Sequence, residues 1–169
     1  MSEVVDMCRK IRNNSRSFVL NPNNNWRNFD DRFIEIVNAE WQEFKFLDDS
    51  GQQINSAITS VPNDAGGIYM FILQPDIVPV VHKYILYIGR VQRSENQHIR
   101  KRLREYIKDT RPSIEEMREN WGEYLYIRYL PLDDNSLIRE LEDALIEAII
   151  PPFNDQYPGK LNQAMRNAF

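Results

Sequence analysis

The stretch that decides the fold is GIYMFILQPDIVPVVHKYILYIG, residues 67–89. It holds two short apolar runs, 68–73 and 84–88, both rich in β-branched and aromatic residues and each with a glycine at one end. A proline-containing link separates the runs. Two such runs around a turn-rich link predict paired strands, most simply an antiparallel hairpin. The hairpin brings Tyr69 and Tyr87 into one small sheet, so the direction of their phenol groups matters for function.

The rest of the chain predicts helices around one more firm strand. Apolar residues recur at helical spacing in several stretches, and aromatic residues alternate in another. The expected helices are 2–12 (N-cap Ser2, with Val5, Cys8 and Ile11 packed inward), 30–47 (N-cap Asp30 or Asp31), 97–109, a short helix that ends at Asn120, and a last helix that runs from its N-cap Ser136 to Pro151. The expected strand is 121–130, and a shorter strand is considered near 54–58. This order predicts an α/β (α+β) fold, in which helices flank a small three-stranded, mainly antiparallel sheet.

Composition bounds the class of protein. At 169 residues, with 42% hydrophobic and 27% charged residues, the chain is long enough for one core and too short for two ordinary domains. The single cysteine, Cys8, excludes an intramolecular disulfide, and with only His82 and His98 beside it a structural zinc site is not expected. No run of 18 apolar residues and no signal peptide is found, so we expect a cytoplasmic protein with no membrane segment.

The charge of the chain is unevenly distributed. The net charge is −4, but residues 90–111 hold eight Lys/Arg against three Glu/Asp, so this window carries +5 and the remainder −9. A basic stripe on an acidic body suits phosphate binding. A solvated helix face explains the same charges equally well.

One carboxylate stands out on the helix expected after Ser136. Glu142 projects between Ile146 and Ile149, at the edge of the apolar arc, where a carboxylate is costly to desolvate without a charged partner. An arginine or a metal ion would serve as that partner, and both alternatives stay open at this point.

The order of these motifs resembles the GIY-YIG nuclease superfamily. Gly67-Ile68-Tyr69 and Tyr87-Ile88-Gly89 precede a helix that carries Arg102, Glu142 follows on a later helix, and the segment closes with Pro152-Phe153-Asn154. The resemblance covers about residues 66–155, and its closing segment is similar to that of the incision nuclease of bacterial excision repair. The link between the triplets and the loop at 92–97 are longer than the family pattern.

The resemblance implies roles for individual residues. Glu142 would hold Mg²⁺ (or Mn²⁺), Arg102 would clamp phosphate oxygens, and Tyr69 or Tyr87 would be the general base, with Tyr69 slightly favoured. The implied catalytic residues are Tyr69, Tyr87, Arg102, Tyr106, Glu142 and Asn154, and the expected DNA- or phosphate-binding residues are Arg90, Arg93, Arg100, Lys101 and Arg104.

The expected organisation is an N-terminal helical extension (1–65) packed on the core, a nuclease domain (66–157) and a C-terminal tail (158–169). The expected function is that of a divalent-metal-dependent DNA endonuclease with a single active site, of the restriction type or the repair and recombination type. A restriction enzyme would need a homodimer to cut both strands. The extension would serve as a dimer surface, a DNA clamp or packing. The alternative is a catalytically inactive nucleic-acid-binding or interaction module that kept the fold.

Overall fold

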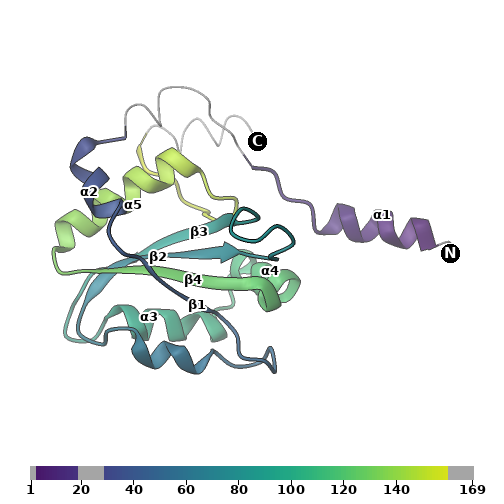
Figure 1. Ribbon diagram of the computed structural model, residues 1–169, viewed down its shortest axis with the longest axis horizontal. Coiled ribbons are helices and arrows are strands. Elements are labelled where there is room, and N and C mark those ends of the chain that lie inside the picture. Colours follow the sequence, from purple (N-terminus) through teal and green to yellow (C-terminus); the bar gives the residue numbers. More distant parts are fainter. Residues whose placement is uncertain (1–2, 19–28, 160–169) are drawn as a thin grey trace.

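The computed structural model describes residues 3–18 and 29–159 of the chain (Figure 1). Helices cover both faces of one sheet, and none of the helices in these ranges is long and apolar enough to cross a membrane. In chain order the elements are α1 (Glu3–Asn13), η1 (Asp31–Phe33), α2 (Ile34–Val37), β1 (Gln42–Lys45), η2 (Ser56–Ser60), β2 (Gly66–Leu73), β3 (Tyr84–Val91), α3 (Ile99–Glu105), η3 (Tyr106–Lys108), α4 (Pro112–Trp121), η4 (Gly122–Tyr124), β4 (Leu125–Leu132) and α5 (Asn135–Ile149). The η elements are short 3₁₀ helices.

The sheet has four antiparallel strands in the order β1-β4-β2-β3. The predicted hairpin is confirmed as β2–β3, and the coarse α+β class is also confirmed. The predicted count of three strands is wrong, because β1 adds a fourth. β2 lies in the centre of the sheet, while β3 forms one edge.

The extra strand comes from a stretch that we expected to be helical. The predicted helix 30–47 is wrong beyond Val37, where the single turn of α2 ends. Residues 42–45 pair instead with β4, placing Phe44 opposite Ile127. The apolar spacing suits a helix or a strand. The strand forms because the edge of β4 would otherwise be unpaired, and the backbone N–H and C=O groups of that edge need partners.

Several boundaries shift for local reasons. The helix at 97–109 is split into α3 and η3. The strand considered near 54–58 is wrong, because Ser56–Ser60 form the 3₁₀ helix η2 and only Ile54 makes an isolated β-bridge, with Leu47. β4 begins only at Leu125, because α4 continues to Trp121. The N-cap of α5 is Asp134 rather than Ser136, since the Asp134 carboxylate accepts hydrogen bonds from two backbone amides of the first turn.

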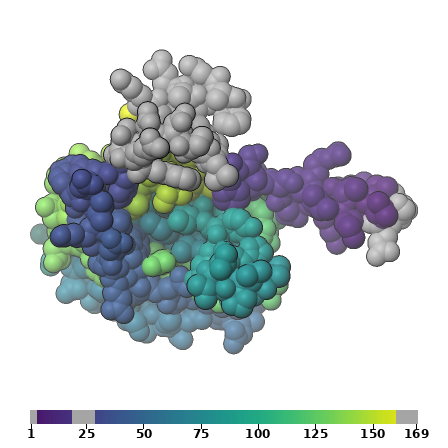
Figure 2. All heavy atoms as spheres, turned by 45° about the horizontal axis from the view of Figure 1, so that its top comes forward, coloured from purple at the N-terminus to yellow at the C-terminus, as the bar shows by residue number. Residues whose placement is uncertain are grey.

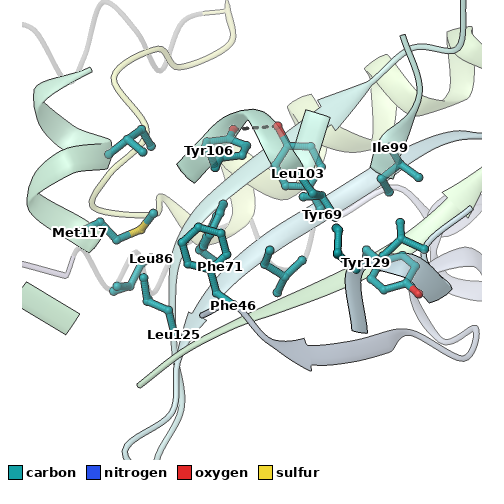
Figure 3. Close-up of a cluster of buried hydrophobic side chains, with 14 of the residues drawn as sticks. Phe46, Tyr69, Phe71, Leu86, Ile99, Leu103, Tyr106, Met117, Leu125 and Tyr129 are labelled. Carbon is teal, nitrogen blue, oxygen red and sulfur yellow. Dashed lines mark hydrogen bonds between the residues drawn. The ribbon is translucent and has the colours of Figure 1, made fainter. Parts of the chain in front are cut away.

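Alternation along β2 divides the core between the two faces of the sheet. Ile68, Met70 and Ile72 pack with α5 on one face. Tyr69 and Phe71 lie on the other face, with α3, α4 and Phe46 (Figure 3). β2 is therefore buried on both sides, as expected of a central strand covered by helices.

Helix α1 forms close to where it is predicted, but it does not pack as predicted. Val5 and Ile11 are 46% and 62% exposed, and Cys8 is also exposed. Figure 1 shows α1 projecting away from the sheet and its helices. The expected N-cap, Ser2, lies outside the described residues, as does most of the expected tail at 158–169.

The two glycines that bound the hairpin, Gly67 and Gly89, are required by close contacts. Gly89 lies opposite Tyr69 in the register of β2 and β3, and the Tyr69 ring covers it. A Cβ atom built on Gly89 would lie 2.5 Å from the Tyr69 hydroxyl oxygen and 2.6 Å from Cζ. Gly67 has φ +148°, and a Cβ there would lie 2.3 Å from the carbonyl oxygen of Leu130. Only glycine fits at either position.

Gly89→Ala should lower the free energy of unfolding by about 1–3 kcal/mol, the usual cost of forcing an extra carbon into a packed core. Denaturant unfolding measures the loss. In a Tyr69→Leu background the same substitution should cost less, because leucine lacks the ring atoms that conflict with the new Cβ. Equal stability of Gly89→Ala and wild type would contradict the contact.

Candidate active site

Three of the predicted catalytic side chains form one buried cluster. The hydroxyl groups of Tyr69 on β2 and Tyr106 in η3 are 2.8 Å apart (Figure 3). Arg102 lies one turn before Tyr106, so both project from the same side of the helix. Arg102 Nε donates to the Tyr69 hydroxyl at 3.4 Å, and its guanidinium lies 4.8 Å from the centre of the Tyr106 ring. The structure thus brings together Tyr69, Tyr106 and Arg102.

Burial controls the ionisation of this cluster. Tyr69 is 1% exposed and Tyr106 is completely buried. Burial raises the pKa of Tyr69 well above its usual value, nearby Tyr87 raises it further, and Arg102 only partly opposes these effects. Burial also raises the pKa of Tyr106. Both phenols are therefore neutral at ordinary pH, and they act as hydrogen-bonding groups.

A second group of predicted residues lines a pocket of about 540 Å³. Tyr87 and Arg90 come from β3, Glu142 comes from α5, and Asn154 comes from the segment after α5. The ring of Tyr87 lies 6.0 Å from the ring of Tyr106, so the pocket and the buried cluster are neighbours. The full lining is Tyr87, Arg90, Arg111, Glu142, Asp143, Ile146, Asn154, Asp155, Gln156, Tyr157, Pro158 and Gly159.

Glu142 has an arginine partner, and that partner is Arg90. The two side chains form an ion pair in which only 13% of the Glu142 side chain is exposed. Burial raises the pKa of Glu142, Arg90 opposes this shift, and Asp143 adds to it. Arg102 pairs instead with Glu105, at 3.0 Å. The sequence alternatives for Glu142 were an arginine or a metal, and the structure supplies the arginine.

The acidic side chains of the pocket also suit a hard cation. Glu142 and Asp143 are adjacent in sequence, both line the pocket, and Asp143 is close enough to raise the pKa of Glu142. Within residues 3–18 and 29–159, no three His, Cys, Asp or Glu side chains gather into a metal-binding group. Mg²⁺ does not need such a cage, since it is usually held by one or two carboxylates and keeps several waters. Glu142 and Asp143 therefore supply oxygen donors of the kind that a hard cation prefers, and both carboxylates face the guanidinium group of Arg90.

Arg111 belongs to the pocket, although the sequence did not single it out. Its guanidinium lies 5.9 Å from the centre of the Tyr87 ring and is held by the carboxylate of Asp109, with Nη2 2.8 Å from Oδ2. This contact lowers the pKa of Asp109, and the charge of Arg102 contributes to the lowering, so Arg102 lies near this pair. The sequence contains Arg111 only as the last residue of a basic window and as a helix end before Pro112. No motif marks it.

The remaining basic candidates lie away from this pocket. Arg93 lines a separate pocket of about 450 Å³. On α3, Arg100 Nε donates to the carbonyl oxygen of Val61, Lys101 Nζ donates to the carbonyl oxygen of Asn96 at 2.6 Å, and Arg104 is exposed. Arg100 and Lys101 therefore hold loops against α3, and Arg104 contributes surface charge.

Asn154 holds β3, the strand that carries Tyr87 and Arg90. Its side-chain amide is buried: Oδ1 accepts from the backbone N–H of Ile88 at 2.9 Å, and Nδ2 donates to the carbonyl oxygen of Ile88 at 2.8 Å. The backbone N–H of Phe153 donates to the carbonyl oxygen of Leu86 at 3.0 Å. This segment therefore pairs with the open edge of β3 at Leu86 and Ile88, on either side of Tyr87, and Asn154 acts as a positioning residue.

Comparison with known proteins adds no relative to this description. No protein-family model, no curated protein and no solved structure matches the chain.

Asn154→Ala should lower the free energy of unfolding by about 1–3 kcal/mol, because it leaves two buried backbone groups of Ile88 without partners. Asn135→Ala is the matched control. Asn135 makes the same pair of bonds to the backbone of Arg93, at 2.8 and 3.1 Å, but on the exposed surface. Water can replace those bonds, so the control should lose about 0.5 kcal/mol or less. Equal losses in the two variants, measured by denaturant unfolding, would contradict the role of Asn154.

Proposed function

We propose that the protein is a divalent-metal-dependent DNA endonuclease that hydrolyses phosphodiester bonds at a single site. The observation that carries the proposal is the shared pocket. A phenol (Tyr87), a largely buried carboxylate (Glu142) and two guanidinium groups (Arg90 and Arg111) line it together. Phosphodiester hydrolysis needs a base for the attacking water, charge stabilisation at the phosphoryl oxygens and help for the leaving oxygen. The pocket offers a candidate for each of the three needs.

The metal would be held at Glu142, with Asp143 beside it. A divalent cation there would neutralise charge on the phosphate and on the leaving 3′ oxygen. In this structure Arg90 pairs with Glu142. The pairing gives this largely buried carboxylate a partner of opposite charge.

Of the two signature tyrosines, we infer that Tyr87 is the base. Tyr87 lines the pocket, whereas the hydroxyl of Tyr69 is buried against Tyr106 and its pKa is raised by burial. This assignment reverses the slight preference for Tyr69 that the resemblance suggests. Tyr87 would first lose its own phenol proton to solvent, and the phenolate would then take a proton from water as the water oxygen bonds to phosphorus. The bond from phosphorus to the 3′ oxygen then breaks, and that oxygen takes up a proton from solvent.

The arginines would bind the phosphate. A guanidinium group is planar and can contact two non-bridging oxygens at once, and it stays charged at any physiological pH. Arg111 is oriented for this role by the carboxylate of Asp109. Arg102 would add positive charge behind the pocket, and Arg104 on the exposed side of α3 would extend the attraction along the DNA.

Glu142→Gln should lower the cleavage rate by about 1,000-fold, the equivalent of ~4 kcal/mol of transition-state stabilisation. Nicking of plasmid and branched DNA in the presence of Mg²⁺ or Mn²⁺ measures the cleavage rate. Glu140→Gln is the matched control, since Glu140 lies on the same helix, pairs with Arg32 and does not line the pocket. Sequencing of the cut ends distinguishes a restriction enzyme from a repair enzyme: one recognition sequence indicates restriction, and scattered ends at branches indicate repair.

Unfolding of the variant would not explain a lower cleavage rate for Glu142→Gln. Because the folded pKa of Glu142 is raised, its ionisation costs stability as the pH rises through that pKa, and glutamine carries no such cost. The variant should therefore be at least as stable as wild type at pH 7, and the difference should shrink in acid. DNA binding without cleavage, unchanged by Glu142→Gln, would instead leave a non-catalytic nucleic-acid-binding module.

Tyr87→Phe should reduce kcat by about 100-fold or more, the usual contribution of a general base. Tyr69→Phe should reduce kcat far less, and should instead lower the free energy of unfolding by about 1 kcal/mol through loss of the bond to Tyr106. Single-turnover rates and denaturant unfolding of both variants separate the two roles. A larger kcat loss for Tyr69→Phe than for Tyr87→Phe would contradict the assignment.

A further inference from the structure

The segment from Tyr106 to Arg111 links the buried cluster to the pocket. Tyr106 is in η3, where its hydroxyl bonds to Tyr69. Arg111 lines the pocket, beside the ring of Tyr87. η3 ends at Lys108, and the last carbonyl groups of a helix have no partners within the helix. The position of Arg111 therefore depends on what binds these carbonyl groups.

Arg118 supplies partners for these carbonyl groups. Nη1 of this half-buried side chain on α4 lies within hydrogen-bond distance of three carbonyl oxygens. The distances are 3.1 Å to Tyr106, 3.0 Å to Ile107 and 3.5 Å to Asp109. A guanidinium group suits this position, because it offers several donors in one plane and because positive charge is favourable at the carboxyl end of a helix. Arg118 therefore holds the backbone of residues 106–109.

Asp109 connects Arg118 to the pocket. Its carbonyl oxygen is one of the three acceptors of Arg118. Its carboxylate accepts from three groups of Arg111: the backbone N–H and Nε, both 3.0 Å from Oδ1, and Nη2, 2.8 Å from Oδ2. These bonds hold the Arg111 guanidinium 5.9 Å from the centre of the Tyr87 ring. A donor group that is fixed in advance loses less conformational freedom when it binds a phosphate.

The helix that carries Arg118 is itself held firmly. α4 begins directly after Arg111, whose carbonyl oxygen accepts from the backbone N–H groups of Ile114 and Glu115 at 2.9 Å. Met117, the neighbour of Arg118, packs into the core on the face of the sheet that α3 and α4 cover (Figure 3). Arg118 is not among the described residues that line the pocket. Its side chain therefore reaches the site only through the segment that it holds.

We propose that Arg118 is a positioning residue, which holds Arg111 in place for phosphate binding through the carbonyl groups of residues 106–109 and the carboxylate of Asp109. The inference rests on the proposed function, in which Arg111 binds a phosphate of the DNA backbone. Arg118 does not contact the DNA in this scheme, and it acts only on the geometry of Arg111. Two experiments test the connection, one without DNA and one with it.

Proton exchange at Arg111 tests the connection without DNA. Arg111 Nε lies 3.0 and 3.1 Å from the two carboxylate oxygens of Asp109, so its Hε should exchange slowly with water. Arg118→Met keeps an unbranched apolar side chain and removes the donors, and it should speed the exchange of this proton at least about tenfold, as Asp109→Ala should. Nuclear magnetic resonance of the arginine Nε–Hε groups measures the exchange rate. An unchanged rate in Arg118→Met overturns the proposal.

Two further variants separate positioning from a loss of the fold. Arg118→Lys keeps a cation with donors and should restore most of the protection of the Arg111 proton. Arg118→Gln keeps an uncharged donor and gives the same comparison, at smaller amplitude, if Arg118→Met does not fold. The backbone amide spectrum of each variant shows whether it is folded. Full protection in a folded Arg118→Gln together with Arg118→Met that does not fold would show a structural role alone and would overturn the proposal.

Binding of duplex DNA without divalent metal tests the same connection in a double-mutant cycle. Arg111→Ala and Arg118→Met should each weaken binding at low salt about fivefold to tenfold, and should each lower the slope of log K against log salt by about one, the loss of one phosphate contact. The double variant should bind no more weakly than Arg111→Ala alone, because Arg118 acts only through Arg111. Losses that multiply in the double variant overturn the proposal.

Arg12→Ala is the matched control for the loss of one positive charge. Arg12 lies on α1, which stands clear of the body of the protein (Figure 2). Its effect on binding should be the same in wild type and in Arg111→Ala, since the two sites are independent. A wild-type protein that neither binds nor cuts DNA would contradict the proposed function, whereas the proton exchange of Arg111 would still decide whether Arg118 positions it.

Discussion

The Tyr69 ring lying over Gly89 is the contact on which the rest of the structure depends. β2 is the central strand, and glycine opposite Tyr69 leaves room for the ring to lie flat against β3. The hydroxyl held in this way bonds to Tyr106 of η3, and so fixes η3 and the preceding helix α3 against the sheet. The next side chains along β2 point to the other face and pack α5. One strand thereby places both helices that carry the candidate site.

The sheet order gives the two hairpin tyrosines, Tyr69 and Tyr87, different surroundings. Tyr69 is on the central strand, where burial raises its pKa and leaves it a neutral hydrogen-bonding group. Tyr87 is on the edge strand, where it lines a pocket with Glu142 and two arginines. Asn154 protects that edge by bonding to both backbone groups of Ile88, so β3 is held in place without another strand. The central strand of the hairpin, β2, thus supports the fold, and the edge strand, β3, carries the tyrosine of the proposed active site.

Features that depend on local pattern could be predicted, and features that depend on distant partners could not. The hairpin and α5 follow from strand composition and helical spacing, and the structure has both. The helix 30–47 was predicted wrongly because its apolar spacing also suits a strand, and the unpaired edge of β4 lies more than 80 residues away along the chain, at Leu125–Leu132. Arg111 could not be singled out, since its place beside Tyr87 depends on the packing of β3 against the turn that follows η3.

The sequence by itself determined the β2–β3 hairpin, the α+β class and the position of Glu142 at the edge of an apolar helix face. These follow from side-chain periodicity, which acts within a few residues. Only the tertiary structure decided that Glu142 meets Arg90 and that Tyr87 rather than Tyr69 lines the pocket. Strand order and burial set each of these outcomes, and both arise from contacts between segments far apart in the chain.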